Sequence, residues 1–174
     1  MTIVLLGYMA SGKSSIGRAL AMKLSFKFID LDDFIEKREQ ESVSQIFKNK
    51  GEIYFRNKEK AYLTKLLDLN GDWVISLGGG TPCYGNNMEL ILKGSISFYL
   101  NASIQTIVER LKDETFQRPL VATIGQENLK EYIAKHLFER TVYYERAQHS
   151  IPVNDKDIDQ IVLEIHKFIR SDMK

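Results

Sequence analysis

The chain has 174 residues, a length that suits one domain with a full hydrophobic core and leaves little room for two. Its 24 Lys and Arg against 23 Asp and Glu give a net charge of +1, so bulk electrostatics favour neither nucleic acid nor a membrane surface as a partner. A single cysteine, Cys83, excludes an internal disulfide, and no apolar run approaches the ~20 residues of a membrane span, so we expect a cytoplasmic protein.

The first expected element is a buried strand over 2–6, which leads into the glycine-rich stretch GYMASGKS at 7–14. This stretch satisfies the pattern G-x-x-x-x-G-K-[ST], and apolar residues at spacing four predict a helix directly after it. Backbone N–H groups in such a turn can surround a phosphate at the helix N-terminus. Lys13 would add positive charge at the β and γ oxygens, and Ser14 a hydroxyl ligand for Mg²⁺.

The rest of the chain alternates between strand and helix patterns. A second strand at 26–30 completes a β-α-β unit, which predicts parallel strands and a right-handed crossover. Further strands are expected at 73–77, 96–100 and 150–153. Helices are expected from residue 32 or 33, from 42 to a stop at Gly51, from 52 to 70, and at 87–92, 104–111, 127–148 and 158–170. The pattern indicates a doubly wound α/β domain with five strands, and only 112–126 is expected to be irregular.

Two carboxylates, Asp30 and Asp32, end the second expected strand. Ligands bind beyond the carboxyl ends of strands in an open parallel sheet, so both should lie at the same edge as the phosphate loop. In an extended segment the two side chains would point the same way while Leu31 faces the opposite side. One would face Mg²⁺ through water, and the other a hydroxyl of the phosphate acceptor. The alternative is that Asp32 only caps the next helix, as we expect Asp33 to do.

Arg56 and Glu59 are three residues apart on the helix expected from residue 52. Glu59 falls on the apolar stripe of this helix, where a carboxylate needs a partner, and Arg56 is within reach. A guanidinium held in this way would present a rigid fork to an anion. A solvated surface pair fits the same spacing.

Three further features could face a ligand. Arg140 lies within the apolar stripe of its helix, so it is either buried in an ion pair or pointed into a pocket. The three glycines at 78–80 offer bare peptide groups at a strand end to a small polar ligand, or serve only the shape of a turn. Arg118, in the irregular stretch, could cover the phosphates and stabilise the transferring group, or could be an ordinary solvated arginine.

In this order the motifs resemble the shikimate kinase family, in the nucleoside-monophosphate-kinase-like branch of P-loop proteins. The resemblance runs from Thr2 to about Val153. It rests on the phosphate loop, FIDLD at 28–32, GEIYFR at 51–56, LGGG at 77–80, RPL at 118–120 and Arg140. It implies a three-layer P-loop kinase fold, with a five-stranded parallel sheet in the order 2-3-1-4-5 flanked by helices. It also implies one kinase domain over 1–174, with a substrate-binding region at about 32–60 and a lid at about 112–126.

The resemblance implies ATP-dependent phosphorylation of the shikimate 3-hydroxyl, a step toward chorismate and the aromatic amino acids. The implied ATP-binding residues are Ala10, Ser11, Gly12, Lys13, Ser14, Ser15 and Arg118, and the implied Mg²⁺ ligands are Ser14 and, through water, Asp30. The implied shikimate-binding residues are Asp32, Arg56, Gly78, Gly79, Gly80 and Arg140, with Glu59 supporting Arg56. Asp32 would orient the hydroxyl and take its proton late, while Lys13 and Arg118 offset the charge.

Two positions depart from the family pattern. Ala10 stands where the family usually has a third loop glycine, and Leu31 replaces a small hydroxyl residue between the two aspartates. Two other functions stay open: a kinase of another polyhydroxy acid such as gluconate, and a switch that turns ATP or GTP over slowly. Guanine specificity normally needs N-K-x-D, and the nearest string, NKEK at 57–60, lacks the Asp. We expect a monomer, because no exposed apolar stripe is left over.

Overall fold

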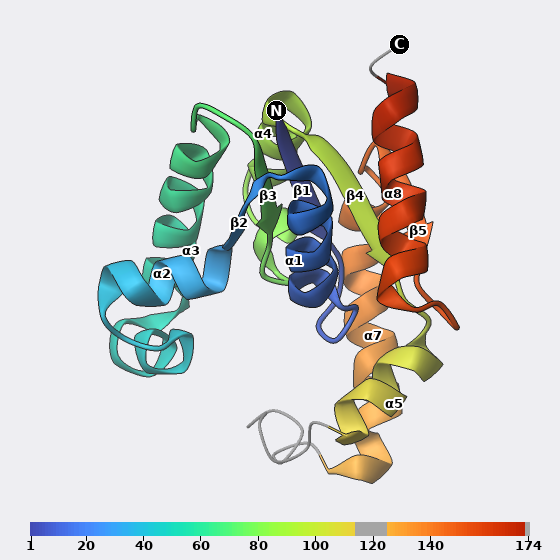
Figure 1. Ribbon diagram of the computed structural model, residues 1–174. Helices are drawn as coiled ribbons and strands as arrows, with labels where there is room; N and C mark the ends of the chain where they lie inside the picture. Colours follow the sequence, from blue (N-terminus) through green and yellow to red (C-terminus); the bar gives the residue numbers. More distant parts are fainter. Residues whose placement is uncertain (114–124, 173–174) are drawn as a thin grey trace.

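A computed structural model describes residues 1–113 and 125–172, which form three layers with one parallel sheet in the middle (Figure 1). The strands are β1 (Thr2–Leu6), β2 (Lys27–Asp30), β3 (Trp73–Ser76), β4 (Ile96–Asn101) and β5 (His149–Pro152). They pair in the order β2-β3-β1-β4-β5, and every pair is parallel, which confirms the predicted order. All five residues of β1 are buried, because this apolar strand is covered on both faces.

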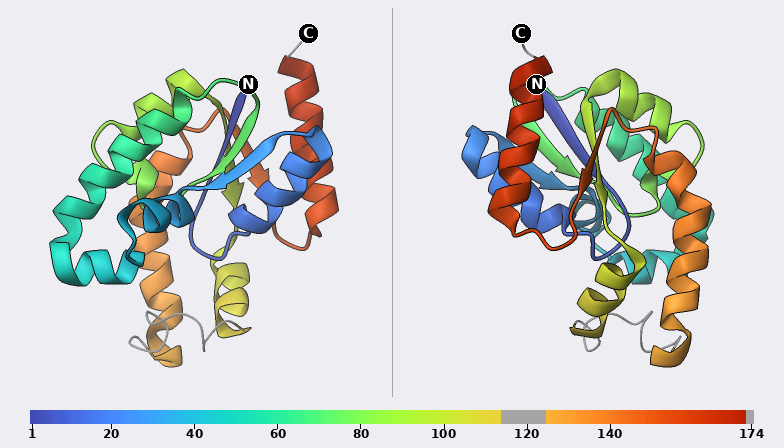
Figure 2. Two further views of the ribbon diagram at one scale, coloured as in Figure 1. Left: turned by 60° about the vertical axis from the view of Figure 1, so that its left-hand side comes forward. Right: turned by 90° about the vertical axis from the view of Figure 1, so that its right-hand side faces the viewer.

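Helices cover both faces of the sheet (Figure 2). Their bounds are α1 (Lys13–Leu24), α2 (Leu31–Glu39), α3 (Val43–Leu67), the 3₁₀ turn η1 (Thr81–Cys83), α4 (Asn87–Gly94), α5 (Ile104–Asp113), α7 (Gln126–Tyr144) and α8 (Ile158–Asp172). One face carries α1 and α8 side by side, and the other carries α3, α4 and α7. Helix α2 packs on α3 beside the edge strand β2, while α5 packs on the part of α7 that extends past the sheet. No helix in the described part of the chain combines the length and the apolar character needed to cross a membrane.

The local signals at the start of α3 are confirmed. The Ser42 side chain accepts a hydrogen bond from the Gln45 N–H at 3.2 Å, and the Gln45 side chain accepts one from the Ser42 N–H at 2.8 Å. This reciprocal pair is the predicted capping box. Gly51 has φ 82° and ψ 169°, which breaks the helical path at the predicted stop.

The end of α7 differs from its prediction. A helix to residue 148 was expected, but α7 ends at Tyr144, and the next residues form tight turns such as Arg146 N–H to Tyr143 C=O at 3.2 Å. The turns bring Gln148 against β4, where its side-chain oxygen accepts from the Ser97 N–H at 2.6 Å and the Ser97 hydroxyl at 2.8 Å. A contact across 51 residues therefore sets this helix end, and helical periodicity does not report it.

Candidate active site

The phosphate loop between β1 and α1 has the backbone shape that its glycines predict. Gly7 and Gly12 have φ of 147° and 95°, backbone angles that residues with a Cβ rarely adopt. Ala10 also has a positive φ of 58°, so alanine takes up a left-handed conformation where the family usually has glycine. The Lys13 ammonium lies over the loop and donates to the carbonyl oxygens of Gly7 at 3.0 Å and Tyr8 at 2.8 Å.

A cavity of about 580 Å³ opens in front of this loop. Lys13 and Ser14 line it on the loop side, and Asp30 and Asp32 line it from the ends of β2 and the start of α2. Gly79, at the end of β3, is also part of its wall. The cavity therefore joins the phosphate loop to both carboxylates at the carboxyl edge of the sheet.

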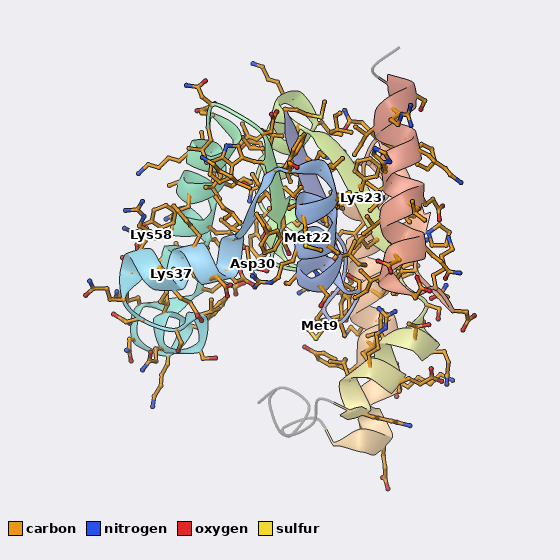
Figure 3. All side chains as sticks on the ribbon, in the orientation of Figure 1. Met9, Met22, Lys23, Asp30, Lys37 and Lys58 are labelled. Carbon is orange, nitrogen blue, oxygen red and sulfur yellow. The ribbon has the colours of Figure 1, made fainter. Side chains whose placement is uncertain are left out.

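Asp30 accepts hydrogen bonds from both the phosphate loop and the first turn of α2. Its Oδ2 accepts a hydrogen bond from the Ser14 hydroxyl at 2.6 Å, and its Oδ1 accepts from the N–H groups of Asp32 at 3.0 Å and Asp33 at 3.5 Å. The prediction that Asp33 caps the helix is wrong, because Asp30 is the last extended residue and therefore the N-cap. Figure 3 shows Asp30 between α2 and α1, in keeping with these contacts.

Asp32 lies in the first turn of α2, so the expected strand-like alternation with Leu31 is also wrong. Its half-buried carboxyl group nevertheless lines the cavity. Burial first, and then the negative charges of Asp30 and Glu59, raise the pKa of Asp32 to about 7, although the Lys13 ammonium acts in the opposite direction. A carboxyl group with this pKa can gain or lose a proton near neutral pH.

The glycine turn after β3 makes room for the charged side chains of the site. A Cβ on Gly78 would lie 2.8 Å from Oδ1 of Asp32. A Cβ on Gly80 would lie 2.9 Å from Nη2 of Arg56. Any other residue at these two positions would displace a carboxylate or a guanidinium, so the absence of side chains there has a steric reason.

Arg56 is held by a buried partner. Its Nη1 donates to Oε2 of Glu59 at 2.9 Å, and the Glu59 side chain is only 1% exposed. The alternative of a solvated surface pair is therefore wrong. The Tyr84 ring covers one face of the guanidinium, with 3.9 Å between Cζ and the ring centroid, and Oε1 of Glu52 lies 3.4 Å from Nε.

Arg140, half-buried on α7, lies against the phosphate loop. Its Cζ is 5.7 Å from the centroid of the Tyr8 ring, within the range of a cation–π contact. Its Nη1 is 3.6 Å from where a Cβ on Gly79 would stand. The buried Tyr144 fixes that glycine by donating its hydroxyl to the Gly79 carbonyl at 2.6 Å. Gly79 lines the cavity, whereas Arg56 and Arg140 are not part of its lining.

Sequence reasoning missed the residues at the other end of the cavity, where Arg110, Lys156 and Ile158 contribute to the wall. Arg110 donates to the carbonyl oxygens of Ala10 at 3.0 Å and Val153 at 3.3 Å, which ties α5 to the phosphate loop. Both contacts cross more than 40 residues, so no local pattern marks them. The sequence shows only an arginine directly before the apolar Leu111, which does not indicate these partners.

The structure describes only the two ends of the predicted lid. Of the range 112–126, residues 114–124 lie outside the described part of the chain, and Arg118 is among them. The role of Arg118 over the phosphates stays a prediction.

Comparisons with known proteins agree with one another. The family model for shikimate kinase matches residues 9–170. A shikimate kinase of Flavobacterium johnsoniae is 48% identical over 164 residues, which cover 94% of this chain and 95% of that relative. The crystal structure of shikimate kinase from Bacteroides thetaiotaomicron has a TM-score of 0.92 at 32% identity and covers 98% of both chains. The Acinetobacter baumannii shikimate kinase in complex with shikimate has a TM-score of 0.88 at 29% identity, over 98% of this chain and 93% of that one.

Proposed function

This chain belongs to the shikimate kinase family, and we propose that the residues gathered at the carboxyl edge of its sheet carry out the family's reaction. That reaction is the transfer of the γ-phosphoryl group of ATP to the 3-hydroxyl of shikimate, in the biosynthesis of aromatic amino acids. The observation that carries the assignment of residues is the single cavity that Lys13, Ser14, Asp30 and Asp32 line together. A phosphate donor and a hydroxyl acceptor can meet there.

ATP would bind with its phosphates in the loop from Ala10 to Ser15, at the N-terminus of α1. The left-handed turns at Ala10 and Gly12 and the position of the Lys13 ammonium over the loop support this. Lys13 would exchange its contacts with loop carbonyls for the β and γ oxygens. The nucleoside would extend toward Arg110, where a planar guanidinium borders the cavity.

Mg²⁺ fits the oxygen donors between β2 and the phosphate loop. The Ser14 hydroxyl and the Asp30 carboxylate are 2.6 Å apart, and both are ligand types that this ion prefers. Mg²⁺ is usually held by one or two carboxylates together with substrate phosphates, so a dedicated cage is not needed. The described residues contain no group of three or more His, Cys, Asp or Glu that could hold a metal. When bound, the ion would neutralise charge on the β and γ oxygens.

Shikimate would lie beside Asp32 and the glycine turn, which adjoin each other at Gly78. Its carboxylate would bind Arg56 and Arg140, because guanidinium groups match a carboxylate in shape and charge. Backbone N–H groups of Gly79 and Gly80 would meet ring oxygens. Asp32 would orient the reacting hydroxyl, and its pKa of about 7 suits a group that takes a proton late in the transfer.

A coupled assay of ADP release, with and without shikimate, tests this function. We expect release to depend on shikimate and on Mg²⁺, with a turnover of about 1–100 per second. The same assay with gluconate in place of shikimate is the control for acceptor specificity. Phosphorylation of gluconate alone would overturn the substrate assignment. Slow ATP turnover that ignores every acceptor would favour a nucleotide-dependent switch.

We further propose that residues 1–174 work as one kinase domain, as a monomer in the cytoplasm. Cys83 suits a reducing compartment as an ordinary thiol, since burial raises its pKa to about 11. The sequence argument for a monomer was wrong in one respect: Phe138 and Val142, four apart on α7, are 82% and 62% exposed, so an apolar pair is left over. Sedimentation velocity at several protein concentrations tests the monomer, and an increase in mass with concentration would contradict it.

A further inference from the structure

We propose that Thr81 is a positioning residue for the acceptor: its hydroxyl fixes Glu59, and Glu59 fixes Arg56. The inference rests on the proposed role of Arg56 in binding shikimate. It needs no contact between Thr81 and the substrate. Thr81 is the first residue of η1 and directly follows the glycine turn.

The contacts form one chain. The Thr81 hydroxyl donates to Oε1 of Glu59 at 2.6 Å, and the other oxygen of the same carboxylate accepts from Nη1 of Arg56 at 2.9 Å. The side chains of Thr81 and Glu59 are 0% and 1% exposed. Both oxygens of a buried carboxylate are thus engaged, one by a hydroxyl and one by the guanidinium.

The hydroxyl has a fixed position because both ends of Thr81 are tied to its surroundings. Its N–H donates to the Gly78 carbonyl at 3.1 Å, and its carbonyl accepts from the buried amide of Asn87 at 2.9 Å. Its Oγ1 lies 3.1 Å from where a Cβ on Gly78 would stand, and Oδ1 of Asp32 lies 2.8 Å from the same point. The hydroxyl therefore packs beside the turn that also adjoins the proposed base.

Glu52 is a second carboxylate partner of Arg56, and it competes with Glu59 for the guanidinium if the Thr81 hydroxyl is removed. Oε1 of Glu52 lies 3.4 Å from both Nε and Nη2 of Arg56, and it also accepts a hydrogen bond from the exposed Tyr84 hydroxyl. A buried Glu59 oxygen left without a donor is costly, so the carboxylate would turn to find one. Arg56 would then be drawn toward Glu52 on the exposed side of α3, away from the glycine turn.

Substitutions at Thr81 separate the hydroxyl from the shape of the side chain. Thr81→Val keeps the branched shape and Thr81→Ala leaves space, and both remove the hydroxyl. We expect each to raise KM for shikimate about tenfold, the value of one hydrogen bond to a charged group, while KM for ATP changes less than about twofold. Thr81→Ser keeps the hydroxyl and should stay within about twofold of the wild type.

A matched control removes a hydroxyl elsewhere on the helix of Glu59. The Thr64 hydroxyl donates to the Lys60 carbonyl at 3.0 Å, within the same helix. Thr64→Val should leave both KM values unchanged. A merely structural role of Thr81 would lower the folded fraction, and hence kcat, without a selective change in KM for shikimate.

A second measurement does not depend on the reaction. In ¹⁵N-labelled protein, the Nε–H signal of Arg56 should be sharp in the wild type and in Thr81→Ser, and broadened in Thr81→Val and Thr81→Ala. An unchanged KM for shikimate in both hydroxyl-free variants, or an unchanged Arg56 signal, overturns the inference. If the wild type does not phosphorylate shikimate, the proposed function fails, and the NMR comparison still decides whether Thr81 holds Arg56.

Discussion

The phosphate half and the acceptor half of the site are built differently. The phosphate half is one continuous segment, 7–15, which uses backbone turns and the N-terminus of α1. The acceptor half takes single side chains from α2, α3 and α7, spread from Asp32 to Arg140. Those side chains are held by other side chains and by the glycine turn. Changes in the phosphate half should therefore lower catalysis with any acceptor, whereas changes in the acceptor half should affect only the binding and reaction of shikimate.

We expect the largest loss of kcat from a substitution in the phosphate half. Lys13→Met removes the cation over the loop, and we expect kcat to fall about 10³-fold, the scale of losing one preorganised charge in a transition state. The ADP-release assay at saturating shikimate measures it. Lys23→Met, at an exposed position on the same helix, is the control and should change little. A loss below about tenfold would contradict a role of Lys13 at the phosphates.

The next effect lies at the junction of the two halves. Asp32→Asn keeps the shape of the side chain and removes its charge, so kcat should fall about 10²-fold or more while ATP still binds. Turnover and calorimetric titration with ATP give the two quantities. Asp33→Asn, one residue further along α2 and exposed, is the matched control. Near-normal turnover of Asp32→Asn would refute its role.

A smaller effect sharpens the division between the halves. Arg140→Lys keeps the charge but loses the planar fork, so KM for shikimate should rise about tenfold with KM for ATP unchanged. Arg146→Lys replaces an exposed arginine paired with Glu89 and should have no effect. A parallel rise in KM for ATP would contradict the division, and would identify the contact between Arg140 and Tyr8 as a link between the halves.

The smallest effect concerns the support of the acceptor half. Glu39 at the end of α2 accepts hydrogen bonds from Tyr54 at 2.6 Å and Tyr62 at 2.7 Å, and its pKa is lowered to about 2, mainly by these bonds. The folded state thus binds the proton less tightly than the unfolded chain. The ionised Glu39 carboxylate therefore stabilises the folded state fully above about pH 5, and this contribution is lost as the pH falls toward 2. Glu39→Gln should lower the free energy of unfolding at pH 7 by about 1 kcal/mol.

Urea unfolding of wild type and Glu39→Gln at pH 7 and pH 3 measures this contribution. The difference between the two proteins should shrink at pH 3, where the carboxylate in the unfolded chain is protonated. Glu41→Gln changes a neighbouring carboxylate that pairs with Lys50 near the surface, and its effect should be smaller. Equal effects of the two substitutions would show that the tyrosine contacts contribute nothing.

The same contrast explains what the sequence could predict. The phosphate loop and the capping box at Ser42 follow from local patterns, and the parallel pairing follows from the β-α-β alternation, so they were predicted correctly. The strand order was implied by the resemblance to the shikimate kinase family, and it is confirmed. The cap of α2 was assigned to Asp33 because the segment from Asp30 to Asp32 was expected to stay extended, whereas α2 begins at Leu31. Cap positions shift by a residue with tertiary context, and pattern reasoning does not resolve them.

The acceptor half was predicted only in part. The spacing of Arg56 and Glu59 correctly indicated a buried pair, since a carboxylate on an apolar stripe needs a partner. Nothing local indicated Thr81, whose contact with Glu59 spans 22 residues and joins two different elements. The direction of Arg140 was left open, because helical periodicity gives the face of a helix and not the neighbours of one side chain.

The bare turn at 78–80 has a consequence for redesign. Because a Cβ on Gly78 or Gly80 would displace the side chain of Asp32 or Arg56, a substitution at either glycine would disturb the site itself. Selectivity would have to be altered through the long side chains that reach the turn from other elements. A mutant library aimed at new acceptors should leave Gly78 and Gly80 untouched and vary the surroundings of the two arginines.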